Sequence, residues 1–189
     1  MDLHERLRRT GRLAGFALAD SIEGLDARRP LPPVVLCELD DRIVIEHFVS
    51  LSTAAPFLDA PPPNVRRAAL RLDGFASMAD LHRAQRGAPQ PALVVIGRDY
   101  TEGPRVDFRY ELPYFRHGYQ LELGASAIDG VTGDDLAPLQ DGIELGEQGN
   151  PHGAKLWRQL RALNDGLEGR WDELLAEALL AYSQLAVTP

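Results

Sequence analysis

The sequence predicts a single α+β domain over residues 1–189, with a central, mainly antiparallel sheet of about five or six strands and N- and C-terminal helices packed on it. Three observations favour this class: an amphipathic helical pattern at the N-terminus, a series of short apolar or alternating runs in the middle, and a second helical region at the end. Strands joined by short turns pair antiparallel. The chain lacks the regular strand–helix alternation of a doubly wound parallel sheet.

The first element is an amphipathic helix over residues 3–25. Its apolar positions recur at helical spacing: Leu3, Leu7, Ala14, Leu18, Ile22 and Leu25. Gly11 and Gly15 weaken such a helix by up to ~1 kcal/mol each, but the missing side chains also permit close packing. Pro30, Pro32 and Pro33 then end the helical pattern.

Two apolar, β-branched runs follow, residues 34–39 and 42–49, and the pair Asp40 and Asp41 between them predicts a hairpin. Both runs are apolar on both faces, which favours two strands in the interior of the sheet.

This hairpin decides whether Cys37 and His47 could act as a nucleophile and its base. A two-residue turn places Cys37 opposite Val44 and His47 opposite Val34. The two side chains then point to opposite faces of the sheet, because side chains alternate along a strand. We therefore expect Cys37 to be a buried structural cysteine.

The remaining elements are read from the same patterns. We expect a short helical turn over 52–58, strands over 64–75, 92–97, 105–112 and 119–123, and a C-terminal helical segment over about 154–186. The strand over 105–112 alternates apolar and charged residues, which predicts one buried and one wet face. In the last segment, a Trp-Leu-Tyr stripe between Trp171 and Tyr182 indicates a helix that packs on the sheet or forms a homodimer.

Composition narrows the functional classes. The net charge of −8 disfavours general binding to nucleic acid and docking on anionic membranes. One cysteine forms no intrachain disulfide, and no apolar run approaches the roughly 20 residues that span a bilayer, so we expect a cytoplasmic protein. A single lysine against 19 arginines is typical of a GC-rich bacterial genome.

Nearly all of the net charge lies between His117 and Ala154. This stretch holds seven acids, no lysine or arginine, and eight of the 17 glycines, whereas the other 151 residues carry 21 acids and 20 bases. A long acidic and glycine-rich stretch predicts a surface loop, here over about 124–152.

Motifs for catalysis, phosphate binding or zinc binding are absent, so we assign no catalytic residue, metal ligand or cofactor. The cluster Asp129, Asp134 and Asp135, flanked by His117 and His152, contains hard oxygen donors for Ca²⁺ or Mg²⁺, but its spacing is not that of an EF-hand. The aromatic and arginine residues between 100 and 119 fall on different strand faces, which favours core packing over stacking of single-stranded nucleic acid.

The leading hypothesis is a non-enzymatic protein of immunity or adaptor type that binds a partner with a basic surface. Its expected partner-binding residues lie in the acidic stretch: Asp129, Asp134, Asp135, Asp141, Glu144 and Glu147. Two alternatives stay open: an enzyme with a divalent metal held by Asp134, Asp135 and His152, and a structural subunit that assembles through the C-terminal helix.

Overall fold

The computed structural model describes residues 1–40, 42–75, 90–117 and 119–165. The elements are α1 (Leu3–Asp26), β1 (Val34–Glu38), β2 (Ile43–His47), α2 (Leu51–Asp59), β3 (Arg67–Phe75), β4 (Pro91–Asp99), β5 (Val106–His117), β6 (Gln120–Leu123), β7 (Ala127–Asp129), the 3₁₀ turn η1 (Gly133–Asp135), α3 (Leu136–Glu147) and α4 (Pro151–Asp165).

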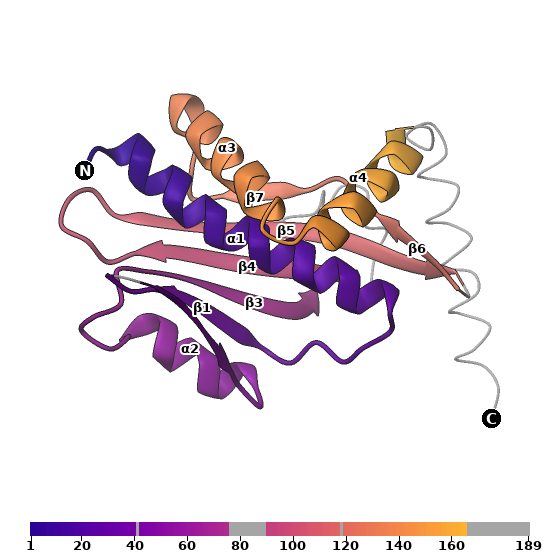
Figure 1. Cartoon of the computed structure of the whole chain (residues 1–189), viewed down its shortest axis with the longest axis horizontal. Coiled ribbons are helices and arrows are strands. Elements are labelled where there is room, and N and C mark those ends of the chain that lie inside the picture. The colour runs from indigo at the N-terminus through magenta and orange to yellow at the C-terminus, as the bar shows by residue number, and fades with distance from the viewer. Residues whose placement is uncertain (41, 76–89, 118, 166–189) are drawn as a thin grey trace.

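The predicted fold class is confirmed: one antiparallel sheet carries helices from both parts of the chain. Its strand order is β2-β1-β3-β4-β5-β6, and β7 also pairs with β5. Helices α1, α3 and α4 lie on one side of the sheet and α2 lies on the other (Figure 1). Both faces therefore bury a hydrophobic cluster, a large one beneath α1 and a smaller one beneath α2.

Helix α1 forms where the sequence predicts it. The carboxylate of Asp2 accepts a hydrogen bond from the Glu5 backbone N–H at 2.8 Å, which satisfies one of the free donors of the first turn. The expected apolar face is buried, including Leu7, Leu18 and Ile22. The helix thus forms the centre of the larger core.

Charged side chains fix the start of α1 to the sheet. Arg6 of α1 and Arg67 of β3 lie on either side of Asp99 at the end of β4, with N–O distances of 3.1 and 2.7 Å. All three side chains are at most 1% exposed. Glu38 of β1 also contacts Arg67, at 2.8 Å. Because Arg6, Arg67 and Asp99 are enclosed by the protein, we assign this buried ion cluster a structural role.

Helix α3 packs against α1 through glycines on both helices. A Cβ atom on Gly15 would lie 1.9 Å from the Ile143 carbonyl oxygen, and one on Gly142 would lie 2.1 Å from that of Arg8. Gly11 and Gly146 make equally close approaches. The two backbones are therefore in direct contact, at a separation that no other residue permits.

The predicted acidic loop over 124–152 is wrong, because most of it is regular structure. It contains β7, η1, all of α3 and the first residues of α4. Leu139 and Ile143, one turn apart, are buried in the larger core. The glycines of this stretch allow α3 to approach α1 instead of providing a flexible chain.

The hairpin between β1 and β2 has the predicted register. Cys37 pairs with Val44 and Val34 pairs with His47. Strand β1 is interior, as expected, but β2 is an edge strand whose residues are mostly exposed. The expectation of two interior strands is therefore wrong for β2.

Two further expectations need correction or lie outside the described residues. The strand over 105–112 is not wet along the whole of one face, because the Glu111 side chain is fully buried. The C-terminal segment begins with α4 at Pro151, three residues before the expected start, and the stripe from Trp171 to Tyr182 lies outside the described residues. No described helix has both the length and the apolar character needed to cross a membrane.

Candidate functional site

The six acids expected to bind a partner do not form one surface. Glu147 is only 8% exposed and faces into the protein, so it is unsuited to contact a partner. Asp129 of β7 lies opposite Arg109 of β5 in the strand register. This register places the Asp129 side chain on the sheet face opposite to α1 and α3. We therefore exclude Glu147 and Asp129 from the candidate site.

The other four acids lie on η1 and α3, and we call this set the acidic ridge: Asp134, Asp135, Asp141 and Glu144. Asp141 and Glu144 are three residues apart on α3 and both are exposed. Asp134 and Asp135 form the end of η1, immediately before α3. A rigid helix thus carries the charges that the sequence predicts on a loop.

Two side chains of α1 contact the acidic ridge. His4 lies 3.3 Å from Asp135, and Arg8 lies 4.0 Å from Asp141. These pairs are exposed and contribute little to stability. Asp134 and Glu144 form no ion pair with the described residues. Negative charge before α3 also favours the helix itself through the helix dipole, which is a structural role for Asp134 and Asp135.

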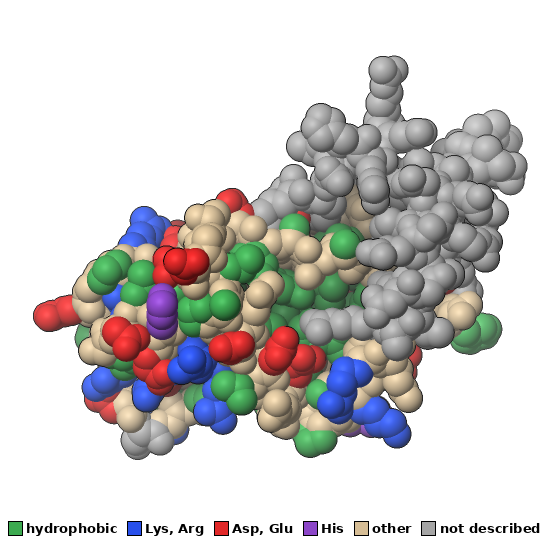
Figure 2. Space-filling model, turned by 90° about the horizontal axis from the view of Figure 1, so that it is seen from above, with side chains coloured by type: hydrophobic (Ala, Val, Ile, Leu, Met, Phe, Trp, Pro, Cys, Tyr) green, Lys and Arg blue, Asp and Glu red, His purple; other side chains and the backbone are tan. Residues whose placement is uncertain are grey.

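A groove of about 610 Å³ lies beside the acidic ridge, over the outer face of α1. It extends from Leu145 of α3 to the start of β2, and its lining is Glu5, Arg8, Arg9, Arg12, Leu13, Glu38, Leu39, Asp40, Arg42, Ile43 and Leu145. Figure 2, which looks down on the α1 and α3 side, shows acidic and basic side chains intermixed on this surface. The groove therefore has mixed charge.

The acidic side chains that line the groove already have basic partners. Each acid in its lining is paired: Glu5 with Arg8 and Arg9, Glu38 with Arg67, and Asp40 with Arg66. The hydrogen bond from Arg9 lowers the pKa of Glu5, so that this carboxylate stays ionised. Among the described residues, the lining holds the carboxylates of Glu5, Glu38 and Asp40 and includes no serine, cysteine, histidine, tyrosine or lysine.

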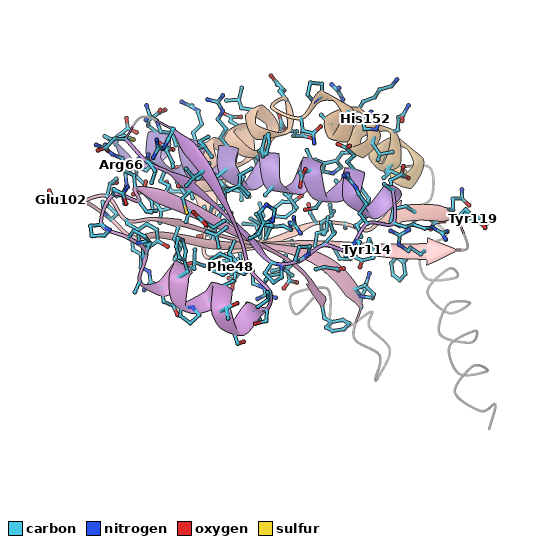
Figure 3. The ribbon with its side chains drawn as sticks, turned by 60° about the horizontal axis from the view of Figure 1, so that its bottom comes forward. Phe48, Arg66, Glu102, Tyr114, Tyr119 and His152 are labelled. Atoms are coloured by element: carbon cyan, nitrogen blue, oxygen red, sulfur yellow. The ribbon has the colours of Figure 1, made fainter. Side chains whose placement is uncertain are left out.

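Cys37 and His47 are separated as the sequence predicts. Cys37 is fully buried in the smaller core, whereas His47 is exposed on the other face of the sheet. Figure 3 shows Phe48, the next residue, lying beside α2. Burial, with a smaller contribution from the charge of Glu46, raises the pKa of the Cys37 thiol to about 11.

We expect Cys37 to resist thiol-labelling reagents in the folded protein at pH 8. The thiolate is the reactive form, and both burial and the raised pKa suppress it. Labelling should proceed at the rate of an unfolded thiol once denaturant is added. Rapid labelling without denaturant, measured by the absorbance of the released chromophore, would contradict the buried placement.

The alternative metal site is not assembled by the described residues. Asp134 and Asp135 lie before α3, and His152 lies on α4, beyond the other end of this helix. Twelve residues of α-helix are about 18 Å long. Figure 3 shows His152 on the outer side of α4. Within the described part of the chain, no three His, Cys, Asp or Glu side chains are placed to hold one metal ion.

The groove is the feature that sequence reasoning missed. Arg8, Arg9 and Arg12 are visible in the sequence as charges on the outer side of the first helix, but their neighbours come from β1, β2 and α3. Only the tertiary structure brings these segments together. No protein-family model, curated protein or solved structure matches this chain.

Proposed function

We propose that this protein is a non-enzymatic binding protein that recognises a basic protein surface through the acidic ridge. The observation that supports this proposal is a group of four carboxylates, three exposed and one (Asp135) partly exposed, on η1 and on the helix α3, which is fixed to α1. Such a surface attracts a cationic partner at a distance and presents its charges in a fixed order. The groove beside the ridge contributes arginines and apolar side chains to the same side of the molecule.

The test compares two variants that lose the same charge. The ridge variant replaces the four acids of the ridge with their amides: Asp134→Asn, Asp135→Asn, Asp141→Asn and Glu144→Gln. The control variant replaces four exposed acids that lie outside the ridge: Asp26→Asn, Asp59→Asn, Asp73→Asn and Glu102→Gln. The wild-type protein, immobilised, serves to isolate the partner from a cell extract, and the purified partner is then used for rate measurements.

We expect the ridge variant to associate roughly tenfold or more slowly than wild type at low salt, because electrostatic attraction acts mainly on the association rate. High salt should reduce this difference, since it screens the attraction. The control variant should retain most of the wild-type rate. Equal losses in both variants would show a dependence on net charge alone, and unchanged rates in the ridge variant would refute the proposal.

The ridge variant should unfold at nearly the wild-type temperature, because its exposed ion pairs contribute little. A large loss of stability would instead indicate that Asp134 and Asp135 act mainly on the helix dipole of α3. Thermal unfolding followed by circular dichroism separates this structural role from recognition.

A further inference from the structure

Strand β2 leaves one edge of the sheet open. It is the terminal strand of the sheet and pairs only with β1 among the described strands. Helix α1 packs mainly on β3 and β4, and α2 packs on β1 and β3, so neither helix covers β2. Figure 1 shows the hairpin of β1 and β2 at the border of the sheet.

The backbone of β2 has hydrogen-bonding groups that point away from β1. The Leu39 N–H donates to the Arg42 carbonyl at 2.8 Å, and the Phe48 N–H donates to the Pro33 carbonyl at 2.9 Å. Along β2, successive residues direct their backbone N–H and C=O groups alternately toward β1 and away from it. Because Arg42 and Phe48 bond to the β1 side, Val44 and Glu46 also direct their backbone groups toward β1. The N–H and C=O groups of Ile43, Ile45 and His47 point outward from the sheet.

The side chains at this edge are also unusual for an open strand. Ile43 is 55% exposed and Ile45 is 48% exposed, and both point to the same face. Val49 and Leu51, just beyond the strand, are 93% and 50% exposed. Edge strands are normally protected by lysine, proline or a bulge, and β2 contains none of these.

We propose that β2 pairs with β2 of a second copy of this chain, antiparallel about a two-fold axis at Val44. In this register Ile43 lies opposite the partner subunit's Ile45, and Val44 lies opposite the partner subunit's Val44. The outward backbone groups of Ile43 and Ile45 then form four hydrogen bonds across the axis. The same surface is used twice, as a two-fold interface requires.

The charges at the ends of the strand favour this occupant and this register. Arg42 lies opposite the partner subunit's Glu46, and the reverse pair forms on the other side of the axis. Both side chains are exposed, and neither forms an ion pair with the described residues. The segment from Arg42 to Glu46, Arg-Ile-Val-Ile-Glu, is therefore complementary to itself when reversed.

A shift of the axis to Ile45 removes this complementarity. Arg42 would then lie opposite Phe48, and Val44 would lie opposite Glu46. The register centred on Val44 alone combines apolar pairs at the centre with opposite charges outside them. A five-residue strand on each side makes a small interface, so we expect a dissociation constant in the micromolar range and measurements at tens to hundreds of micromolar protein.

Charge reversal tests both the second copy and the register. Arg42→Glu alone and Glu46→Arg alone each place like charges opposite one another twice in the dimer. We expect each single variant to raise the dissociation constant about ten- to thirty-fold in sedimentation equilibrium. The double variant with both changes should dimerise like wild type. An equimolar mixture of the two single variants should also dimerise, because both of its cross-pairs carry opposite charges.

Ile45→Lys is the variant that should abolish the dimer, since it places a charge in the apolar centre of the interface. Circular dichroism is used to check that each variant is folded. We expect Ile45→Lys to fold, because Ile45 is exposed. A wild-type monomer at several hundred micromolar would overturn the proposal. A dimer that Ile45→Lys leaves intact would place the interface elsewhere. Loss of association in both the double variant and the mixture would exclude this register.

Discussion

We expect Asp99→Ala to reduce the free energy of unfolding by about 3–5 kcal/mol, the largest effect of any single substitution considered for this fold. The carboxylate of Asp99 lies between the guanidinium groups of Arg6 and Arg67, and it also accepts hydrogen bonds from Thr101. Its removal leaves two buried positive charges without their common partner. Denaturant unfolding followed by tryptophan fluorescence measures the loss.

The control for this prediction is Asp59→Ala. Asp59 also pairs with an arginine, Arg98, at 2.5 Å, but its side chain is 67% exposed. Water screens this pair, so we expect a loss below about 1 kcal/mol. If Asp99→Ala were equally mild, Arg6 and Arg67 would have to reach solvent in the variant, and the buried ion cluster would not anchor α1.

The same carboxylate makes stability depend on acid pH. Burial alone would raise the pKa of Asp99, but hydrogen bonds from Thr101 and Arg6 and the charge of Arg67 outweigh it and lower this pKa. A carboxyl group with a lowered pKa stabilises the fold above its unfolded pKa of about 3.9, and this contribution is lost as the pH falls through the folded value. Asp99→Asn should therefore show a smaller decrease in stability below about pH 4 than wild type does.

Gly15→Ala should destabilise the protein by about 1–3 kcal/mol, although the same change in an ordinary helix stabilises it by up to ~1 kcal/mol. A Cβ atom at this position would lie 1.9 Å from the carbonyl oxygen of Ile143. A backbone atom of α3 occupies the site, so the two helices must separate. A decrease of about 2–4 °C in melting temperature per kcal/mol is expected for a domain of this size.

Gly24→Ala is the matched control, since it changes the same residue type in the same helix. There the added Cβ atom would lie 2.7 Å from the end of the Leu31 side chain, which is a flexible neighbour and not a backbone atom. The free energy of unfolding should change by no more than about 1 kcal/mol in either direction. A neutral Gly15→Ala beside a neutral Gly24→Ala would mean that α3 is not held tightly against α1.

Local patterns were sufficient to predict α1, the register of the hairpin and the antiparallel pairing of strands joined by short turns. Each of these follows from periodicity or from a short turn, which a sequence contains directly. The separation of Cys37 from His47 followed from the hairpin alone, because side chains alternate along a strand.

Two features depended on distant contacts and were not predicted. Gly142 and Gly146 indicate a loop when they are considered alone, and they become helical contact positions only beside Gly11 and Gly15 of α1. The pattern of β2 is that of an interior strand, because its apolar residues do not reveal that none of the described strands pairs with its outer side. For the contact between α1 and α3, the sequence contained one signal: Gly11 and Gly15 have the same four-residue spacing as Gly142 and Gly146.

The direct contact of the α1 and α3 backbones also has a thermodynamic consequence for the proposed recognition of a partner. A loop with these acids would lose conformational entropy when a partner ordered it, and this loss would weaken the complex. On α3 the backbone is already ordered by folding, so that only side-chain rotamers are restricted at the surface. In the proposed complex, the glycines of α1 would thereby favour affinity by reducing the entropic cost of binding.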